Sequence, residues 1–254
     1  MKKYIILLML CTLCVSCSRN YGEPVTKEFP ISGTYTCLDI SHAFEVTVSD
    51  QVTDVMVTVG EKAIDDVRVE VKDGTLFIGF NWWNFYEGEA KAVIPAGAVI
   101  DELCLSGAST FTGDLSGDEV ECDLSGSSSY FGNISANDID FDISGSSTYF
   151  GNVTTTTLEM DLSGSSRATI SGSCDDEMEI GISGASNLNA TGFDVQYVKG
   201  NMSGASTAYV NCCRSLRVVL SGASYLYYTT PNAGCNPVID CQTTGSSAVA
   251  PMVH

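Results

Sequence analysis

The tetrapeptide Ser-Gly-Ala-Ser, or its variant Ser-Gly-Ser-Ser, occurs seven times between Ser106 and Ser224 of this 254-residue chain. The copies start at Ser106, Ser125, Ser144, Ser163, Ser183, Ser203 and Ser221, at intervals of 19, 19, 19, 20, 20 and 18 residues. An altered eighth copy reads Thr244-Gly245-Ser246-Ser247. Such a constant period, in segments rich in Ser, Thr, Gly and β-forming residues, predicts a solenoid whose repeats bury their apolar faces against one another.

The segment before each copy separates into two sets of positions when the copies are aligned on their first serine. Apolar residues dominate the places one, three and five residues before that serine, and acidic residues dominate the places between. The place one before holds Leu105, Leu124, Ile143, Leu162, Ile182, Met202 and Leu220, and the place three before holds Leu103, Cys122, Phe141, Met160, Ile180, Gly200 and Val218. This period of two predicts a β-strand with one buried face and one face in water.

The Ser-Gly pair predicts a corner, because glycine adopts backbone conformations that are strained for other residues. A second short strand follows, most clearly in Tyr130–Ile134 and Tyr149–Val153. Two or three short strands and tight corners in each repeat make one turn of a parallel β-helix, whose equivalent positions lie roughly 4.8 Å apart. We therefore expect an all-β, single-stranded parallel β-helix over residues 99–254, and parallel crossovers favour right-handed winding.

The first 17 residues predict a targeting signal that takes no part in the fold. Lys2 and Lys3 precede an apolar stretch too short to span a membrane, and Cys14-Val15-Ser16-Cys17 ends it. The segment resembles a bacterial lipoprotein signal in which Cys17 carries the lipid, and several acyl chains give a stable membrane anchor. Cys14 departs from the usual leucine, so cleavage by an ordinary signal peptidase is the alternative.

Residues 18–29 predict a short tether behind the lipid anchor. No acidic run follows Cys17 directly. In bacteria of the Bacteroides type, which this signal suggests, such a run accompanies export to the outer surface. We therefore expect a lipid-anchored outer-membrane protein that faces the periplasm rather than the cell surface.

Residues 30–98 predict a β-rich N-terminal cap. Phe44–Val48, Val55–Val59 and Val67–Val71 have strand character, and Lys72-Asp73-Gly74 leads from the last of them into Thr75–Phe80. Asp-Gly between alternating runs is a strong signal for a hairpin. A cap is expected here because the ends of a solenoid are open sheet edges.

These features together resemble the head GIN domain family of auto-transporter adhesins from Bacteroidetes. The resemblance rests on the lipoprotein signal, the Asp73-Gly74 hairpin, the strand Val93-Ile94-Pro95 that leads into Leu103–Ser109, and the repeated Ser-Gly-Ala-Ser; it covers about Tyr35 to Ser247. It implies a right-handed parallel β-helix and a location in the cell envelope. The family brings no set of catalytic residues to transfer.

The net charge limits the classes of partner, and the cysteine content bears on whether the chain contains disulfides. The 31 acidic and 12 basic residues give a formal charge of −19, which makes nucleic acid a poor partner. Eight cysteines follow Cys17, an even number that is compatible with disulfides in an exported chain. Cys212 and Cys235 each lie nine residues before a repeat start, which predicts a disulfide between neighbouring turns. Small buried thiols are the alternative.

Catalysis is not expected. A polysaccharide lyase needs a base and clustered cations, but the repeats offer only Arg167, Lys199, Arg214 and Arg217, scattered among columns. Glycoside hydrolysis needs two carboxylates in unlike environments, whereas the carboxylates here repeat in like positions. The two histidines, His42 and His254, are far apart in sequence, and no zinc-binding motif is present. A carbohydrate-active enzyme is therefore the weakest alternative.

Aromatic residues are the candidate ligand-binding groups, for a glycan or a protein of the envelope or cell surface. One set is in the loop after the hairpin, and the other recurs on the second strand, where only one ring of each adjacent pair can face the core. The candidates are Trp82, Trp83, Phe85, Tyr86, Tyr130, Phe131, Tyr149 and Phe150, and the second-strand ladder continues through Tyr209 and Tyr227. The loop could instead plug the solenoid end, and a purely structural envelope scaffold is a further alternative.

A ladder of carboxylates is expected on the outer side of the longer strands. Its members are Glu121, Asp123, Asp140, Asp142, Glu159 and Asp161. Like charges on adjacent strands repel, so either salt screens the row or a divalent cation such as calcium bridges it. The spacing lacks the glycine-rich nonapeptide of calcium-binding β-rolls, which favours the screened surface, and we expect no other cofactor.

Overall fold

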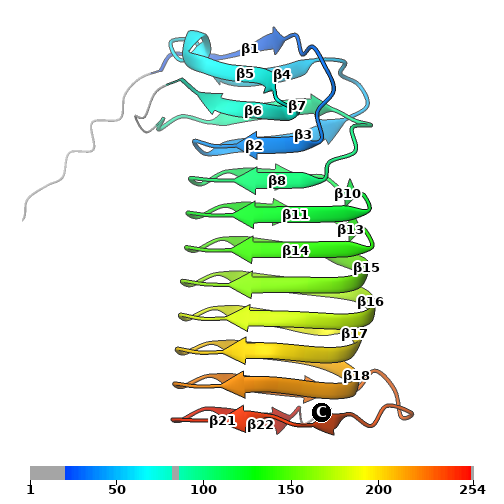
Figure 1. Cartoon of the computed structure of the whole chain (residues 1–254). Coiled ribbons are helices and arrows are strands. Elements are labelled where there is room, and N and C mark those ends of the chain that lie inside the picture. The colour runs from blue at the N-terminus through cyan, green and yellow to red at the C-terminus, as the bar shows by residue number, and fades with distance from the viewer. Residues whose placement is uncertain (1–20, 82–85, 253–254) are drawn as a thin grey trace, which may run out of the picture.

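The computed structural model describes residues 21–81 and 86–252. They form an all-β solenoid of about eight turns, the fold class that the repeats predict (Figure 1). The strands at the front of Figure 1 run to the left while the chain descends, and the chain returns at the back, so the coil is right-handed. A single 3-10 helix, η1 (Ile64–Asp66), is the one helical element among the described residues.

Each turn consists of a longer strand, the Ser-Gly corner and one or two shorter strands. The longer strands of the first three repeats are β8 (Glu102–Leu105), β11 (Glu119–Leu124) and β14 (Asp138–Ile143). The shorter ones are β9 (Thr110–Thr112), β10 (Leu115–Ser116), β12 (Ser129–Phe131) and β13 (Ile134–Ser135). We call the outer side of the longer strands the long-strand face and the outer side of the strand after each corner the short-strand face.

Lower in the solenoid, the strands of one turn merge into continuous, bent strands. These are β15 (Thr148–Leu162), β16 (Arg167–Ile182), β17 (Asn187–Met202) and β18 (Thr207–Leu220). The last described turn contains β19 (Tyr225–Thr229), β20 (Val238–Ile239), β21 (Gln242–Thr243) and β22 (Ala248–Pro251).

Equivalent residues of successive turns lie side by side, as the alignment predicts. β11 pairs in parallel with β14 so that Cys122 lies opposite Phe141 and Leu124 lies opposite Ile143. All four side chains are buried. Because the same register continues from turn to turn, the inward residues form one continuous core along the solenoid axis.

The Ser-Gly corner needs glycine for two reasons. Gly126 has a φ of 75°, a left-handed conformation that side chains rarely adopt. A Cβ atom at Gly126 would also lie 2.4 Å from the carbonyl oxygen of Gly107 in the turn above. The corners therefore stack closely because this position carries no side chain.

A ladder of buried serines lies just after the glycines, and the sequence reasoning missed it. The fourth residue of every copy from Ser109 to Ser224 is buried, whereas the third residue is exposed. In three corners the buried hydroxyl donates to the carbonyl oxygen of the first serine, for example from Ser128 to Ser125 at 2.7 Å. The buried serine therefore satisfies a backbone carbonyl group on the inner side of each of these corners.

The parallel stack begins nearer the N-terminus than the expected boundary at residue 98. β2 (Cys37–Ile40) and β3 (Phe44–Ser49) pair in parallel with β8 and β9, so they form a turn of the solenoid themselves. Their corner has His42 and Ala43 at positive φ in place of the Gly-Ala of the repeat. Because this corner lacks the glycine, the Ser-Gly-Ala-Ser pattern does not include this turn.

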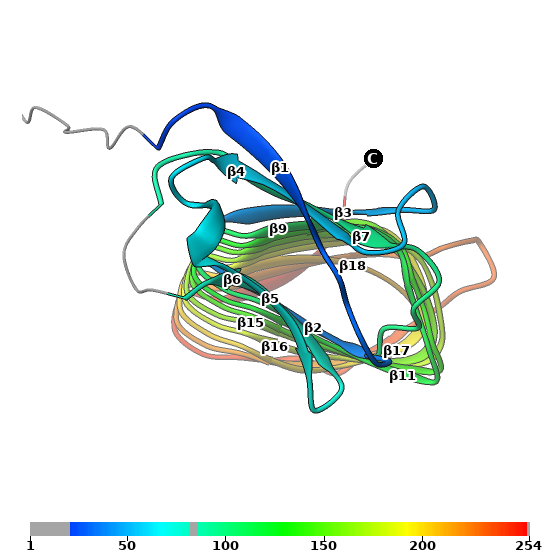
Figure 2. The ribbon, with the colours of Figure 1, turned by 90° about the horizontal axis from the view of Figure 1, so that it is seen from above.

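The remaining N-terminal strands close the upper end of the stack (Figure 2). These are β1 (Pro24–Phe29), β4 (Val55–Gly60), β5 (Val67–Lys72), β6 (Thr75–Phe80) and β7 (Ala90–Pro95). β5 and β6 form the predicted antiparallel hairpin, with Asp73 and Gly74 at positive φ in its turn. β4 pairs antiparallel with β1 and β7, so the upper end presents antiparallel strands rather than an open parallel edge.

Membrane-spanning helices do not occur in the part of the chain that the structure describes.

Candidate functional site

The short-strand face presents two large apolar rings to solvent. Phe131 and Phe150 lie opposite one another on β12 and β15, and they are 41% and 58% exposed. Their chain neighbours Tyr130 and Tyr149 point the other way and are fully buried. The prediction that one ring of each pair faces outward is therefore confirmed for these two turns.

Tyr130 and Tyr149 are core residues, which corrects their inclusion among the candidate ligand-binding groups. Their rings stack with centroids 5.0 Å apart, and the ring of Tyr149 also packs 4.5 Å from that of Phe141. The hydroxyl of Tyr149 donates to the carbonyl oxygen of Gly132, and burial raises the pKa of both phenols. The physical reason is the period of two, which turns consecutive strand residues to opposite sides.

Tyr86 packs within the N-terminal cap, and its assignment as a ligand-binding residue stays a prediction. Its ring lies 4.5 Å from that of Tyr21 and 5.0 Å from that of Phe80. Its hydroxyl accepts a hydrogen bond from the backbone N–H of Gly60 at 2.7 Å. These contacts match the alternative in which the aromatic loop closes the end of the solenoid. Trp82, Trp83 and Phe85 lie outside the described residues.

A second group of rings occurs on the short-strand face near the C-terminal end. Tyr209 of β18 and Tyr227 of β19 stack with centroids 5.1 Å apart. Tyr225 lies 6.5 Å from Tyr227 and is 39% exposed. The sequence reasoning missed Tyr225 as a surface residue, although its spacing of two from Tyr227 places both on the same side of the strand.

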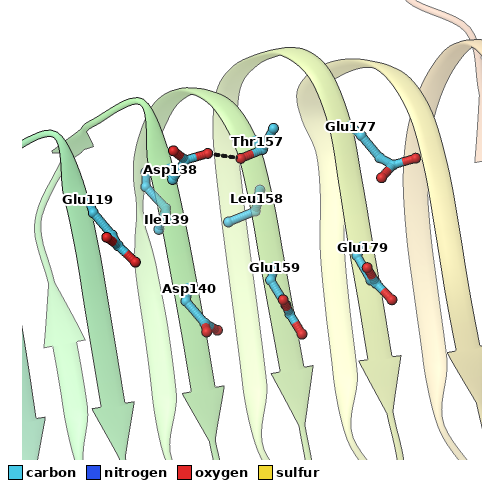
Figure 3. A pocket seen from close by; sticks show the side chains of 9 residues that line it. All are labelled: Glu119, Asp138, Ile139, Asp140, Thr157, Leu158, Glu159, Glu177 and Glu179. Carbon is cyan, nitrogen blue, oxygen red and sulfur yellow. Dashed lines mark hydrogen bonds between the residues drawn. The ribbon is translucent and has the colours of Figure 1, made fainter.

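The predicted carboxylate ladder lies on the long-strand face (Figure 3). Glu121, Asp140 and Glu159 occupy one column, and Asp123, Asp142 and Asp161 occupy the next, because the strands that carry them pair in parallel without a shift. Figure 3 shows Asp140, Glu159 and Glu179 in successive strands around a shallow hollow of about 260 Å³. The hydroxyl of Thr157 donates to Asp138 at its edge.

Three carboxylates of one column of the ladder lie in a setting that disfavours their charged form. Partial burial, and next the neighbouring carboxylates, raise the pKa values of Glu121, Asp140 and Glu159. One cation lies beside two carboxylates in the turn below the ladder. Nζ of Lys199 is 2.7 Å from Glu177 and 3.0 Å from Glu179. Its hydrogen bonds to these two residues raise the pKa of Lys199.

The ladder does not form a cage for a metal ion. Among residues 21–81 and 86–252, no three His, Cys, Asp or Glu side chains come together in a way that could hold a metal. The parallel register places the carboxylates of one column in a row, one in each turn, at the spacing of the strands. The screened surface and the calcium bridge both stay predictions.

The disulfide of the structure joins Cys213 to Cys235, so the predicted Cys212–Cys235 pair was wrong by one residue. A β-bulge is the physical reason. Val195 lies opposite Cys212 and Tyr197 opposite Ser215, so two residues of β18 share the space of one in β17. Cys212 stays in the core, and Cys213 faces the loop that carries Cys235.

Cys212 has a structural role at an inner corner of the solenoid. Its thiol donates to the carbonyl oxygens of Gln196 and Ser215. Cys174 makes the same kind of contacts two turns above, and the hydroxyl of Thr155 makes them one turn above that. These thiols therefore satisfy buried carbonyl groups, as the alternative of small buried cysteines predicts.

The described polar groups that resemble catalytic residues have evident structural roles. Cys37 and Cys104 both donate to the carboxylate of Glu102, and burial, followed by that carboxylate, raises the pKa of Cys104 to about 12. A thiol with so high a pKa is a poor nucleophile near neutral pH. His42 contacts the hydroxyl of the adjacent Ser41 at a corner, and its ring packs edge-on against Phe80.

Solved structures with the same fold come from two Parabacteroides species. The crystal structure of a "putative adhesin" from Parabacteroides merdae ATCC 43184 superposes with a TM-score of 0.81 at 19% identity, covering 91% of this chain and 97% of that one. A "putative lipid binding protein" from Parabacteroides distasonis ATCC 8503 gives 0.79 at 20% identity, covering 91% and 98%. At these identities the likeness shows the fold alone.

Sequence comparison supplies the family. Among curated proteins, none matches this chain. The family model described as "Putative auto-transporter adhesin, head GIN domain" matches residues 34–231, which is most of the chain and includes both the N-terminal turn and the seven repeats. This chain therefore belongs to the auto-transporter adhesin, head GIN domain family.

Proposed function

We propose that this protein is a non-enzymatic, adhesin-like module of the cell envelope that binds a glycan through its short-strand face. The outward rings of Phe131 and Phe150 carry the proposal, because apolar rings at this exposure on adjacent turns form a surface that the described part of the chain leaves open to solvent. The adhesin family and fold agree with a binding role.

Polar groups flank the two rings. Asn133 and Asn152 follow Phe131 and Phe150 by two residues, Asn133 between β12 and β13 and Asn152 within β15. They form a ladder with Asp114, whose carboxylate accepts from both the backbone N–H and the side-chain amide of Asn133. A glycan offers apolar C–H faces and hydroxyl groups together, so rings beside an amide and carboxylate ladder match both parts of it.

The test is capture by glycans and by envelope preparations, with the soluble chain from Ser18, which contains every described residue. We expect Phe131→Ser with Phe150→Ser to reduce capture at least tenfold. The matched control is Val219→Ser, because Val219 is 50% exposed on the long-strand face. Retention of an envelope protein without any glycan would indicate a protein partner. Equal capture by both variants would contradict binding through Phe131 and Phe150. Absence of any capture would support the scaffold alternative, and turnover of a bound glycan would support an enzyme.

We propose in addition that the chain is anchored in the outer membrane through a lipid on Cys17, with the solenoid in the periplasm. Cys17 lies outside the described residues. The proposal rests on the lipoprotein-like signal that ends at Cys17. Fatty-acid labelling should disappear in Cys17→Ala, and globomycin should block processing. Labelling that persists in Cys17→Ala would contradict the anchor.

A further inference from the structure

The three surface tyrosines near the C-terminal end have a defined mutual geometry. The rings of Tyr209 and Tyr227 have planes 15° apart and centroids 5.1 Å apart, so they overlap face to face along the solenoid axis. The planes of Tyr225 and Tyr227 differ by only 13°, but their centroids lie 6.5 Å apart on one strand. Tyr225 and Tyr227 therefore lie side by side along the strand with nearly parallel planes and form one aromatic surface.

Small residues lie beside this surface on the next strand. β22 pairs in parallel with β19, which places Ala248 opposite Tyr225 and Ala250 opposite Tyr227. A methyl group covers little of a phenol ring, so the paired residues leave the ring faces on the C-terminal side largely open. We call the surface of Tyr225, Tyr227, Ala248 and Ala250 the tyrosine shelf.

The shelf lies in an uncharged part of a strongly acidic chain. From Val218 to the C-terminal end of the sequence, Asp240 is the only Asp, Glu, Lys or Arg. Its carboxylate lies 4.0 Å from the guanidinium of Arg217, in the column of Lys199 on the long-strand face. An anionic sugar would be repelled by the formal charge of −19, and an ammonium group would find no carboxylate on the shelf.

We propose that the tyrosine shelf binds an uncharged pyranose residue of a glycan, with the C–H face of the sugar stacked on Tyr225 and Tyr227. The inference rests on the proposed function and extends it to a second contact on the same face. A flat, rigid pair of rings fits a sugar ring at low cost in conformational entropy.

The column between the two aromatic groups supports a glycan that runs along the solenoid axis. Thr169 and Asn189 separate Phe150 from Tyr209, so the gap is three turns, or roughly 14 Å at the spacing of parallel strands. The side-chain oxygen of Asn189 accepts from Thr191, which leaves its amide nitrogen as the group that can donate to a sugar hydroxyl.

The experiment covers the shelf in one variant and removes one of its rings in another. Cellohexaose, xylohexaose, mannohexaose and chitohexaose are the neutral probes, polygalacturonate is the anionic one, and binding to the chain from Ser18 is measured by calorimetry and saturation-transfer NMR. We expect at least one neutral probe to bind, and Ala250→Leu and Tyr227→Ala each to weaken it at least tenfold. Gln242→Leu is the matched control, because it adds the same side chain to the same turn on the long-strand face. It should bind as the unmodified chain does.

The outcomes separate this inference from the proposed function. If Ala250→Leu and Tyr227→Ala leave binding of a neutral probe unchanged while Phe131→Ser with Phe150→Ser removes it, the shelf is wrong and the proposed function stands. Preference for polygalacturonate over every neutral probe also overturns the shelf. If no probe binds and the phenylalanine variant still attaches to envelope preparations like the unmodified chain, both proposals fail. Thermal unfolding of each variant shows that the loss is not due to misfolding.

Discussion

Cys213 and Cys235 are joined by a disulfide with their Cα atoms 4.6 Å apart, and this bond ties the loop between β19 and β20 to β18. The loop is the longest connection of the lower solenoid, and Figure 2 shows it projecting beyond the stacked turns. Cys212 and Cys213 are consecutive, yet the first closes an inner corner and the second holds this loop.

We expect Cys235→Ser to lower the free energy of unfolding by about 2–4 kcal/mol, because the bond restricts the unfolded chain over a separation of 22 residues. Mass spectrometry of the unreduced protein should show the crosslink in Cys212→Thr and lose it in Cys213→Ser. The control substitution is chosen because Thr155 already fills an equivalent corner. A crosslink that survives Cys213→Ser would contradict the assignment.

Tyr149 and Phe150 provide a paired test of the inward and outward positions on β15. Tyr149→Ala should cost about 3–5 kcal/mol, since it removes a fully buried ring from the core. Phe150→Ala, one residue further on, should change stability by no more than about 0.5 kcal/mol because its ring is on the surface. Chemical denaturation of both variants checks this, and equal losses would show that the alternation is misassigned.

Because of three carboxylates of the ladder, we expect the free energy of unfolding to be larger in mild acid than at neutral pH. The pKa values of Glu121, Asp140 and Glu159 are raised in the folded state, so the folded chain holds protons that the unfolded chain has already released. This stability is fully present below the unfolded pKa values near 4 and is lost as the pH rises through the folded ones. At low salt, the melting temperature should be higher at about pH 5 than at pH 7, and Glu121→Gln with Asp140→Asn should reduce the difference.

Salt should stabilise the ladder without regard to the identity of the cation. At matched ionic strength, calcium and magnesium should raise the melting temperature at pH 7 equally, because the described carboxylates form rows and not a cage. A larger effect of calcium that disappears in Asp142→Asn with Asp161→Asn would establish bridging instead.

The repeat alone predicted the solenoid, the parallel register and most of the core. A period near 19 together with an alternation of two leaves little freedom, because each inward residue must meet its counterpart in the next turn. For the same reason, the columns of the carboxylate ladder follow from the sequence. The period of two determined only that one ring of each Tyr-Phe pair faces outward, and the tertiary structure decided that these rings are Phe131 and Phe150.

Where the period of the repeat is broken, only the tertiary structure determined which residues of neighbouring turns lie side by side. The interval from Ser221 to Thr244 is 23 residues, and the additional length lies in the loop that carries Cys235, so counting residues placed this cysteine in the wrong column. The bulge at Cys212 and the glycine-free corner at His42 are further departures that leave no mark in the repeat.

The tyrosine shelf depends partly on the sequence and partly on the tertiary structure. Its spacing of two puts Tyr225 and Tyr227 on one side of a strand, which the sequence by itself determines. Their nearly parallel rings and the alanines opposite them depend on how the last turn pairs with the one before it. That pairing arises from contacts between residues distant in sequence, and such contacts are set by the packed tertiary structure rather than by local preference.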